Sequence, residues 1–261
     1  GNPLYILLHR CRKEGDLFFS ILNYLYFRSI QKRRKLADYI DTYIALTDFA
    51  RNILKRAGLP ADRIQVKSNF LSNSVHHHLS SSDDGYAIFV GRLSFEKGVH
   101  RLLEAWKHID YPLRIIGVGP LLASLQKQAS SQIQFLGALS HEETLSQISH
   151  ASMLLFPSVL YEGMPLSLIE PMALSKPVIA SDLGARREMV RDGYNGFLYP
   201  PNDASALREK VLALIENRQL RATMGKNARE FYLADYTPDI NYNQLMEIYE
   251  TAIIRFKQRI N

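Results

Sequence analysis

Short apolar runs alternate with longer amphipathic stretches between residues 86 and 199, and this pattern predicts the fold. The apolar runs are Tyr86–Val90, Leu113–Ile116, Ile133–Gly137, Met153–Phe156, Pro177–Ala180 and Gly196–Tyr199. The stretches between them have helical spacing and predict helices over Val99–His108, Leu121–Ala129 and His141–Ser149. Strands that alternate with helices form an α/β fold with a doubly wound parallel sheet, and its ligand cleft lies at the carboxyl ends of the strands.

Several residues predict where the helices begin. Ser140 is expected to cap the helix that follows it, with Glu143 in the capping-box position. Pro165 suits the first position of a further helix, because its missing N–H has no partner there and its φ is already helical. Beyond the sheet we expect three more helices, over Asp203–Glu216, over Arg218–Ala234 and from Pro238 to about Arg259.

The front of the chain has its own pattern. We expect a short strand at Leu4–Leu8, a helix over Asp16–Ala37, a strand ending at Leu46 and a helix over Phe49–Ala57 that stops at Gly58. A polar break follows at Val75–Gly85, which we interpret as a linker. The predicted division is therefore a front part over 1–75, a linker over 76–85, a main α/β domain over 86–235 and a final helix over 236–261.

Composition narrows the class of protein. The chain of 261 residues is 46% apolar, which is typical of a globular protein, and its single cysteine excludes an internal disulfide framework and favours a reducing compartment. No apolar run reaches the length of a transmembrane helix, and the start lacks the basic flank of a signal peptide. Since the chain starts with Gly1 and not with methionine, we expect a fragment of a longer, cytoplasmic protein.

Charge is concentrated in the front part. Residues 1–75 hold 13 Lys and Arg against 6 Asp and Glu, whereas the rest holds 19 against 20. The basic peak, Arg28–Lys35, follows an apolar and aromatic stretch, and it has two interpretations. It is either a solvated helix face or a helix attracted to an anionic membrane surface, which would place the protein on the inner face of the plasma membrane. We expect no nucleic acid partner, because no recognition motif accompanies the charge.

The candidate chemistry centres on Tyr161–Pro171, which follows the strand Met153–Phe156. Glu162 and Glu170 flank the predicted helix start, and each carboxylate can accept hydrogen bonds from two neighbouring hydroxyl groups of a sugar. Gly163 lets a ligand approach the backbone closely. The first N–H groups of the helix favour an anion or hydroxyl groups placed against them. An ordinary amphipathic helix with solvated glutamates is the alternative.

A second candidate group lies in the loop after the first main-domain strand. Arg92 and Lys97 suit a diphosphate, Arg92 through its planar fork and Lys97 as a point charge. Two solvated loop cations are the alternative. Gly117 and Gly119 end the next strand, although a bare Gly-x-Gly is a weak signal. Three consecutive histidines, His76–His78, rarely converge on one ion, so we expect no metal site there.

Together these motifs resemble those of one family. Glu162 and Glu170, seven residues apart within Glu-Gly-Met-Pro-Leu-Ser-Leu-Ile-Glu, look like the paired glutamates of retaining glycosyltransferases of the GT4 type. The segment Val90–Gly98 closely matches that family's phosphate-binding loop. The resemblance covers roughly residues 38–261, and it departs from the family pattern at Ala185 and Arg187 while Glu188 is kept.

The resemblance implies a GT-B fold and transfer of a hexose from a nucleotide-diphosphate sugar to a saccharide or lipid-linked acceptor, with retention. It assigns Arg92, Lys97 and Glu162 to catalysis. The implied donor-binding residues are Gly91, Gly117, Gly119, Gln134, Leu136, Gly163, Met164, Pro165, Leu166, Ser167 and Glu170. It also makes residues 1–75 the remnant of an acceptor-side domain, and it places the protein in polysaccharide biosynthesis.

No cofactor or metal is expected, because the two cations and the helix N–H groups can stabilise the leaving diphosphate. Two other functions stay open, namely a nucleotide-sugar-binding module without catalysis and an enzyme like the nucleotide-sugar 2-epimerases. We expect the chain alone to bind a nucleotide sugar with little or no transfer.

Overall fold

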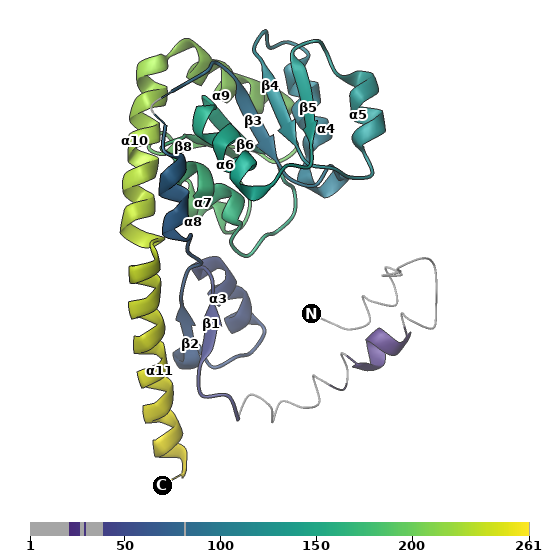
Figure 1. The fold of residues 1–261 in the computed structure, drawn as a ribbon. Coiled ribbons are helices and arrows are strands. Elements are labelled where there is room, and N and C mark those ends of the chain that lie inside the picture. Colours follow the sequence, from purple (N-terminus) through teal and green to yellow (C-terminus); the bar gives the residue numbers. More distant parts are fainter. Residues whose placement is uncertain (1–20, 27–28, 30–38, 81, 261) are drawn as a thin grey trace. The chain divides into compact units, whose positions relative to one another are not determined.

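The computed structural model describes residues 21–26, 29, 39–80 and 82–260 (Figure 1). The predicted strand at Leu4–Leu8, most of the helix at Asp16–Ala37 and the basic segment Arg28–Lys35 lie outside these residues. The chain divides into two compact units. The first comprises residues 1–44, 51–65 and 247–261, and the second comprises residues 45–50 and 66–246.

A six-stranded parallel sheet forms the centre of the second unit. In chain order its strands are β3 (Ala87–Val90), β4 (Leu113–Ile116), β5 (Ile133–Gly137), β6 (Met153–Phe156), β7 (Val178–Ser181) and β8 (Gly196–Tyr199). Their spatial order is β5-β4-β3-β6-β7-β8, and every pair is parallel. The predicted α/β class and the six predicted strands are confirmed, to within one residue at the ends of β3 and β7.

Helices surround the sheet on both faces. They are α4 (Val99–Trp106), α5 (Leu122–Gln128), α6 (His141–His150), α7 (Leu166–Ala173), α8 (Arg186–Met189), α9 (Ala204–Glu216) and α10 (Arg218–Asp235). Figure 1 shows α4 and α6 on opposite sides of β3 and β4. Two buried clusters result, one containing Ile88, Leu154 and Leu168 and the other containing Phe89, Leu155 and Trp106. Alternate residues of one strand thus belong to different clusters, as in any sheet covered on both faces.

Helix ends follow the predicted caps with one exception. Ser140 and Glu143 form the reciprocal capping box at α6, as predicted. Pro165, however, is the N-cap of α7 and not its first helical residue, because its ψ of 122° keeps it extended and the helix begins at Leu166. The prediction for Pro165 is therefore wrong by one position. A proline suits either place, since neither requires an N–H donor.

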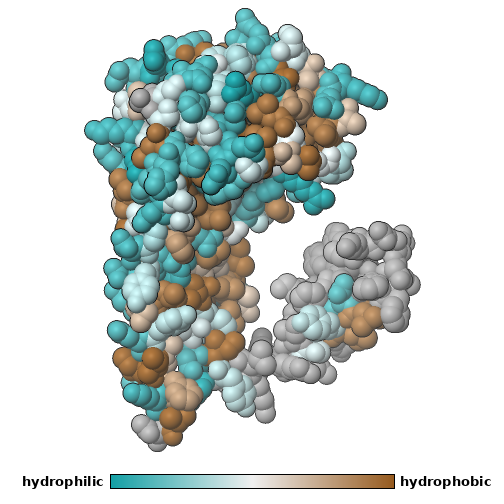
Figure 2. Space-filling view, viewed as in Figure 1, coloured by the Kyte–Doolittle hydropathy of each residue, from teal (hydrophilic) through white to brown (hydrophobic). Residues whose placement is uncertain are grey.

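Two short strands and a helix lie before the main sheet in the chain, and a long helix ends it. Strands β1 (Tyr43–Ala45) and β2 (Ile64–Val66) form a two-stranded sheet, and α3 covers Asp48–Arg56. A 3₁₀ helix, η3 (Asn73–His78), occupies part of the predicted polar break. Helix α11 (Pro238–Ile260) carries exposed apolar side chains, visible in Figure 2; they include Tyr242, Met246, Tyr249, Ile253, Phe256 and Ile260.

Candidate functional site

The order of the strands locates the candidate site. The chain runs from β3 outward through β4 to β5, and then returns to the other side of β3 to form β6 and β7. The carboxyl ends of β3 and β6 are therefore the point where the strand order reverses. In open parallel sheets, the crevice at this switch point is where ligands bind. The loops that follow β3 and β6 carry Lys97 and Glu162.

These two loops are joined by an ion pair. Lys97 Nζ lies 3.0 Å from Glu162 Oε2, and both side chains are largely shielded from solvent. The hydroxyl of Ser158 donates to the other carboxylate oxygen, Glu162 Oε1, at 2.8 Å. The backbones also meet, because the N–H of Val159 donates to the carbonyl of Glu96 at 2.8 Å. The structure therefore brings together two of the four residues on which the sequence prediction depends.

Arg92 lies at the adjoining part of the same edge. Its exposed side chain lines a cleft of about 600 Å³ at the carboxyl ends of β3, β4 and β5. The other lining residues are Val90, Gly91, Ile116, Gly117, Val118, Gly119, Ala138, Leu139 and Thr144. This volume is in the range of small-molecule sites. Gly91, Gly117 and Gly119 thus lie where the sequence placed the donor, whereas their role in binding it stays a prediction.

The glycines of this cleft are also required by packing. A Cβ on Gly117 would lie 2.0 Å from the carbonyl oxygen of Gly91, and one on Gly119 would lie 2.4 Å from that of Leu93. The N–H of Leu93 donates to the carbonyl of Val118 at 3.0 Å, so the two loops are held backbone to backbone. Close approach of these loops, independent of any ligand, accounts for both glycines.

Glu170 faces the same edge from α7 and is paired with a residue that the sequence did not single out. Its Oε1 lies 3.0 Å from Nε2 of His141, the first residue of α6. Thr144 lies one turn further along α6 and lines the cleft. Burial raises the pKa of the Glu170 carboxyl, and the hydrogen bond from His141 acts in the opposite direction. One carboxylate oxygen is thus held by His141, which leaves Oε2 for another partner.

The residues at the start of α7 differ in exposure. Gly163 and Leu166 are exposed, Ser167 is half-buried, and Pro165 is buried. Met164 is also buried, and its sulfur accepts a hydrogen bond from the N–H of Asn69 at 3.1 Å. Its side chain therefore serves the core, and only its backbone could contact a donor. No side chain caps α7.

Two predicted residues lie away from the cleft lining. Gln134 is exposed near the amino end of β5, opposite Arg114 of β4 in the parallel register. Leu136 is partly buried and packs against one of the core clusters. Neither the Gln134 nor the Leu136 side chain lines the cleft with Arg92. That their backbone groups recognise the base of the nucleotide stays a prediction.

The sequence reading missed Arg186, which organises the loop that carries Glu162. Its guanidinium is almost fully buried and donates to the carbonyls of Ser158 (2.7 Å), Ser181 (3.1 Å) and Leu160 (2.5 Å). It also lies 5.1 Å from the ring centroid of Phe156. Burial lowers the pKa of Arg186, while Glu162 counteracts this shift, and the guanidinium stays charged. No spacing rule identifies such a contact.

Glu188 holds the start of α3. Its two carboxylate oxygens accept the backbone N–H groups of Asp48 (2.8 Å) and Phe49 (2.5 Å), which are the first residues of α3. The ring of Phe49 stacks on that of Tyr161 with centroids 5.7 Å apart. The loop of Glu162 is therefore linked to the start of α3 through Tyr161.

Two kinds of feature are absent from the part of the chain that the structure describes. Within it, no three or more His, Cys, Asp or Glu side chains are grouped so that they could hold a metal ion. Also within these ranges, no helix has both the length and the apolar composition needed to cross a membrane.

Comparisons with known proteins agree on one family. The model of the family described as "Glycosyl transferases group 1" matches residues 73–231, more than half of the chain. An uncharacterized glycosyltransferase of Methanocaldococcus jannaschii is 35% identical over 202 residues, which are 69% of this chain and 57% of that protein. A putative colanic acid biosynthesis glycosyltransferase of Salmonella typhimurium is 26% identical over 96% of this chain and 69% of its own length.

Solved structures agree on the fold. The Anabaena protein HepE, crystallised with UDP, superposes with a TM-score of 0.75 at 21% identity, covering 81% of this chain and 64% of HepE. At this identity the match shows the fold alone. The chain spans about half the length of several curated relatives that it matches.

Proposed function

Because the chain belongs to the glycosyl transferases group 1 family, we propose that it binds the nucleotide-diphosphate sugar of a retaining glycosyltransferase that moves a hexose to a saccharide or lipid-linked acceptor. One observation carries this proposal, namely the Lys97–Glu162 pair at the switch point of the sheet, beside the cleft that Arg92 lines. Membership of the family gives the class of reaction.

The proposed chemistry begins at the leaving group. Departure of a sugar leaves a negatively charged diphosphate while the anomeric carbon develops positive charge. Arg92 is exposed in the cleft and can bind two phosphate oxygens through its planar fork. Lys97 adds a second cation, and the backbone N–H groups at Leu166 and Ser167 add the dipole of α7. These groups can stabilise the diphosphate without a metal ion.

The two glutamates hold the sugars. Glu170 presents Oε2 to the ribose diol while His141 holds Oε1. Glu162 lies with Gly163 at the hexose, where its carboxylate accepts hydroxyl hydrogens and balances the charge that develops at the anomeric carbon. Because Lys97 pairs with Glu162, a diphosphate that binds Lys97 competes with this carboxylate.

The acceptor and the location are inferred from relatives. Several have names that include polysaccharide biosynthesis, such as the colanic acid and capsular polysaccharide enzymes. We infer a saccharide or lipid-linked acceptor, and a cytoplasmic protein that Arg28–Lys35 can attach to an anionic membrane surface. A donor-binding module without catalysis remains the second candidate, because the chain spans only part of the relatives that carry out transfer.

A thermal-shift screen with UDP, GDP and ADP sugars tests donor binding. UDP sugars come first, because HepE was crystallised with UDP. One nucleotide class should raise the melting temperature of the chain, and Arg92→Ala or Glu170→Ala should abolish the rise. Lys127→Ala, which removes an exposed cation of α5 outside the cleft, is the matched control. A folded sample that responds to no nucleotide would contradict the proposal.

A further inference from the structure

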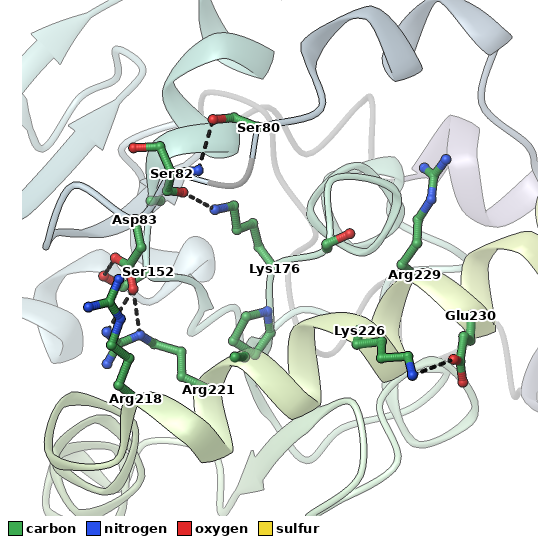
Figure 3. A pocket seen from close by; sticks show the side chains of 14 residues that line it. Ser80, Ser82, Asp83, Ser152, Lys176, Arg218, Arg221, Lys226, Arg229 and Glu230 are labelled. Atoms are coloured by element: carbon green, nitrogen blue, oxygen red, sulfur yellow. Dashed lines mark hydrogen bonds and ion pairs between the residues drawn. The ribbon is translucent and has the colours of Figure 1, made fainter.

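A second cavity lies away from the cleft described above, among segments that precede the strands. Its volume is about 510 Å³, and it is lined by residues that precede β3, β6 and β7 together with one side of α10 (Figure 3). Since the strands are parallel, these segments lie at the amino edge of the sheet, opposite the candidate donor site. The charged lining residues are Asp83, Lys176, Arg218, Arg221, Lys226, Arg229 and Glu230.

Positive charge in this cavity exceeds negative charge. Five cations face two carboxylates. Arg221 is matched with Asp83, with Nη2 and Oδ2 2.7 Å apart, and Lys226 lies 3.8 Å from Glu230. Among the described residues, no carboxylate forms an ion pair with Lys176, Arg218 or Arg229. The cavity therefore keeps a surplus of three positive charges.

Among the charged residues of this cavity, Lys176 is unusual because it is a buried lysine. The residue is only 7% exposed, and its Nζ donates to the carbonyl of Ser82 at 2.8 Å (Figure 3). A lysine is rarely buried unless a carboxylate or another anion accompanies it. Asp83 and Asp84 both act electrostatically on Lys176. Asp83, however, already accepts three hydrogen bonds, from Arg221, from Ser152 and from the N–H of Gly85. Since neither carboxylate forms an ion pair with Lys176 among the described residues, an anion in the cavity would supply a direct countercharge.

We propose that this cavity binds a phosphate group, with Lys176 and Arg218 as its principal ligands. Arg218 is the first residue of α10, and among the described residues no side chain or backbone group forms a hydrogen bond or ion pair with its guanidinium. Arg229 contributes charge, but it also donates to the carbonyl of Ala173 and lies 5.2 Å from the ring of Tyr232, so it has a packing role as well. The phosphate can belong to a free phosphorylated molecule or to a lipid headgroup.

Titration with inorganic pyrophosphate tests the site. The experiment uses the Arg92→Ala chain, so that binding at the candidate donor site does not contribute, in a chloride buffer followed by isothermal titration calorimetry and amide NMR shifts. We expect binding, with shifts at Ser175–Lys176 and along the start of α10. Lys176→Met and Arg218→Ala should each weaken binding by about tenfold or more, because each removes a charge-assisted contact. Lys127→Ala should leave it unchanged.

A parallel arm distinguishes the two sources of phosphate. Vesicles of phosphatidylglycerol are compared with vesicles of phosphatidylcholine in a flotation assay. Retention on phosphatidylglycerol that Lys176→Met abolishes would indicate a headgroup, and pyrophosphate binding without vesicle binding would indicate a free ligand. Either result supports the proposal. Pyrophosphate and vesicle binding that Arg218→Ala and Lys176→Met both leave intact, or no binding of either probe, would overturn it.

Discussion

The carboxylate of Glu162 accepts from Ser158 on one oxygen and faces Lys97 on the other. Lys97 is therefore not a free cation before the donor arrives. A diphosphate that binds at this site would compete with Glu162 for Lys97. Both side chains are largely shielded from solvent, so the desolvation of the two charges offsets their attraction and the pair itself contributes little to stability. The ion pair matters mainly for how tightly Lys97 can bind a diphosphate.

Glu162→Gln separates binding from transfer. Glutamine keeps an oxygen that can accept from Ser158 but carries no charge, so Lys97 is released to the diphosphate. We expect the affinity for the bound nucleoside diphosphate to stay equal or to rise by about tenfold at most, while transfer by the complete enzyme falls by about 100-fold. Calorimetric titration and a product assay measure the two effects. A marked loss of nucleotide affinity would show that Glu162 itself holds the nucleotide.

Glu170→Gln should stabilise the chain and weaken donor binding. Burial raises the pKa of this carboxyl in the folded state. Its charged form therefore costs folding free energy above that pKa, and the cost disappears as the pH falls through it. At pH 8 we expect the glutamine variant to melt about 2–4 °C higher, for a gain near 1 kcal/mol, and the difference should shrink at pH 5. Equal melting temperatures at pH 8 would contradict this reading.

At the scale of elements, close backbone contacts between loops determine which glycines can be replaced by alanine without loss of stability. Gly119→Ala places a methyl group 2.4 Å from the carbonyl oxygen of Leu93, so the loops after β3 and β4 must separate. We expect a loss of about 1–3 kcal/mol in the free energy of unfolding.

A methyl group at Gly163 meets only Leu46, at 3.8 Å. Gly163→Ala should keep the stability and lower the affinity for the nucleotide sugar, but not for the free nucleotide.

The start of α3 depends on a carboxylate far away in the sequence. Glu188 accepts the N–H groups of Asp48 and Phe49, as an N-cap side chain does. We expect Glu188→Ala to cost about 1–2 kcal/mol and to speed hydrogen exchange at these two amides. Glu209→Ala, on the exposed face of α9, is the control. Unchanged exchange at Asp48 and Phe49 would exclude this capping role.

Local rules predicted the elements well because the responsible contacts are local. The capping box joins Ser140 to Glu143, only three residues further on. The strands are short apolar runs, and helices bury them on both faces of the sheet. The motifs predicted that Lys97 and Glu162 lie at one crevice, but not that the two side chains form an ion pair. Arg186, His141 and the cap at Glu188 could not be predicted, because each bond joins residues whose proximity only the folded sheet creates. Pro165 was misplaced because its extended ψ depends on the loop before it.

At the scale of the whole molecule, the two compact units differ in what they carry. Every described candidate donor residue, from Gly91 to Glu170, belongs to the second unit, as do the lining residues of the basic cavity. A ligand stabilises only the folded state that binds it, by about 2.7 kcal/mol at 100 times its dissociation constant. Ligand effects should therefore be confined to one unit.

Hydrogen exchange with and without the nucleotide measures this confinement. We expect slower exchange in the six-stranded sheet and in α7, and unchanged exchange at residues 51–65 and 247–260 of the first unit. Adding the nucleotide to Arg92→Ala should leave both units unprotected, which controls for non-specific effects. Protection of residues 51–65 equal to that of β3 and β6 would mean that the two units unfold together, and the stability changes argued above would then apply to the whole chain.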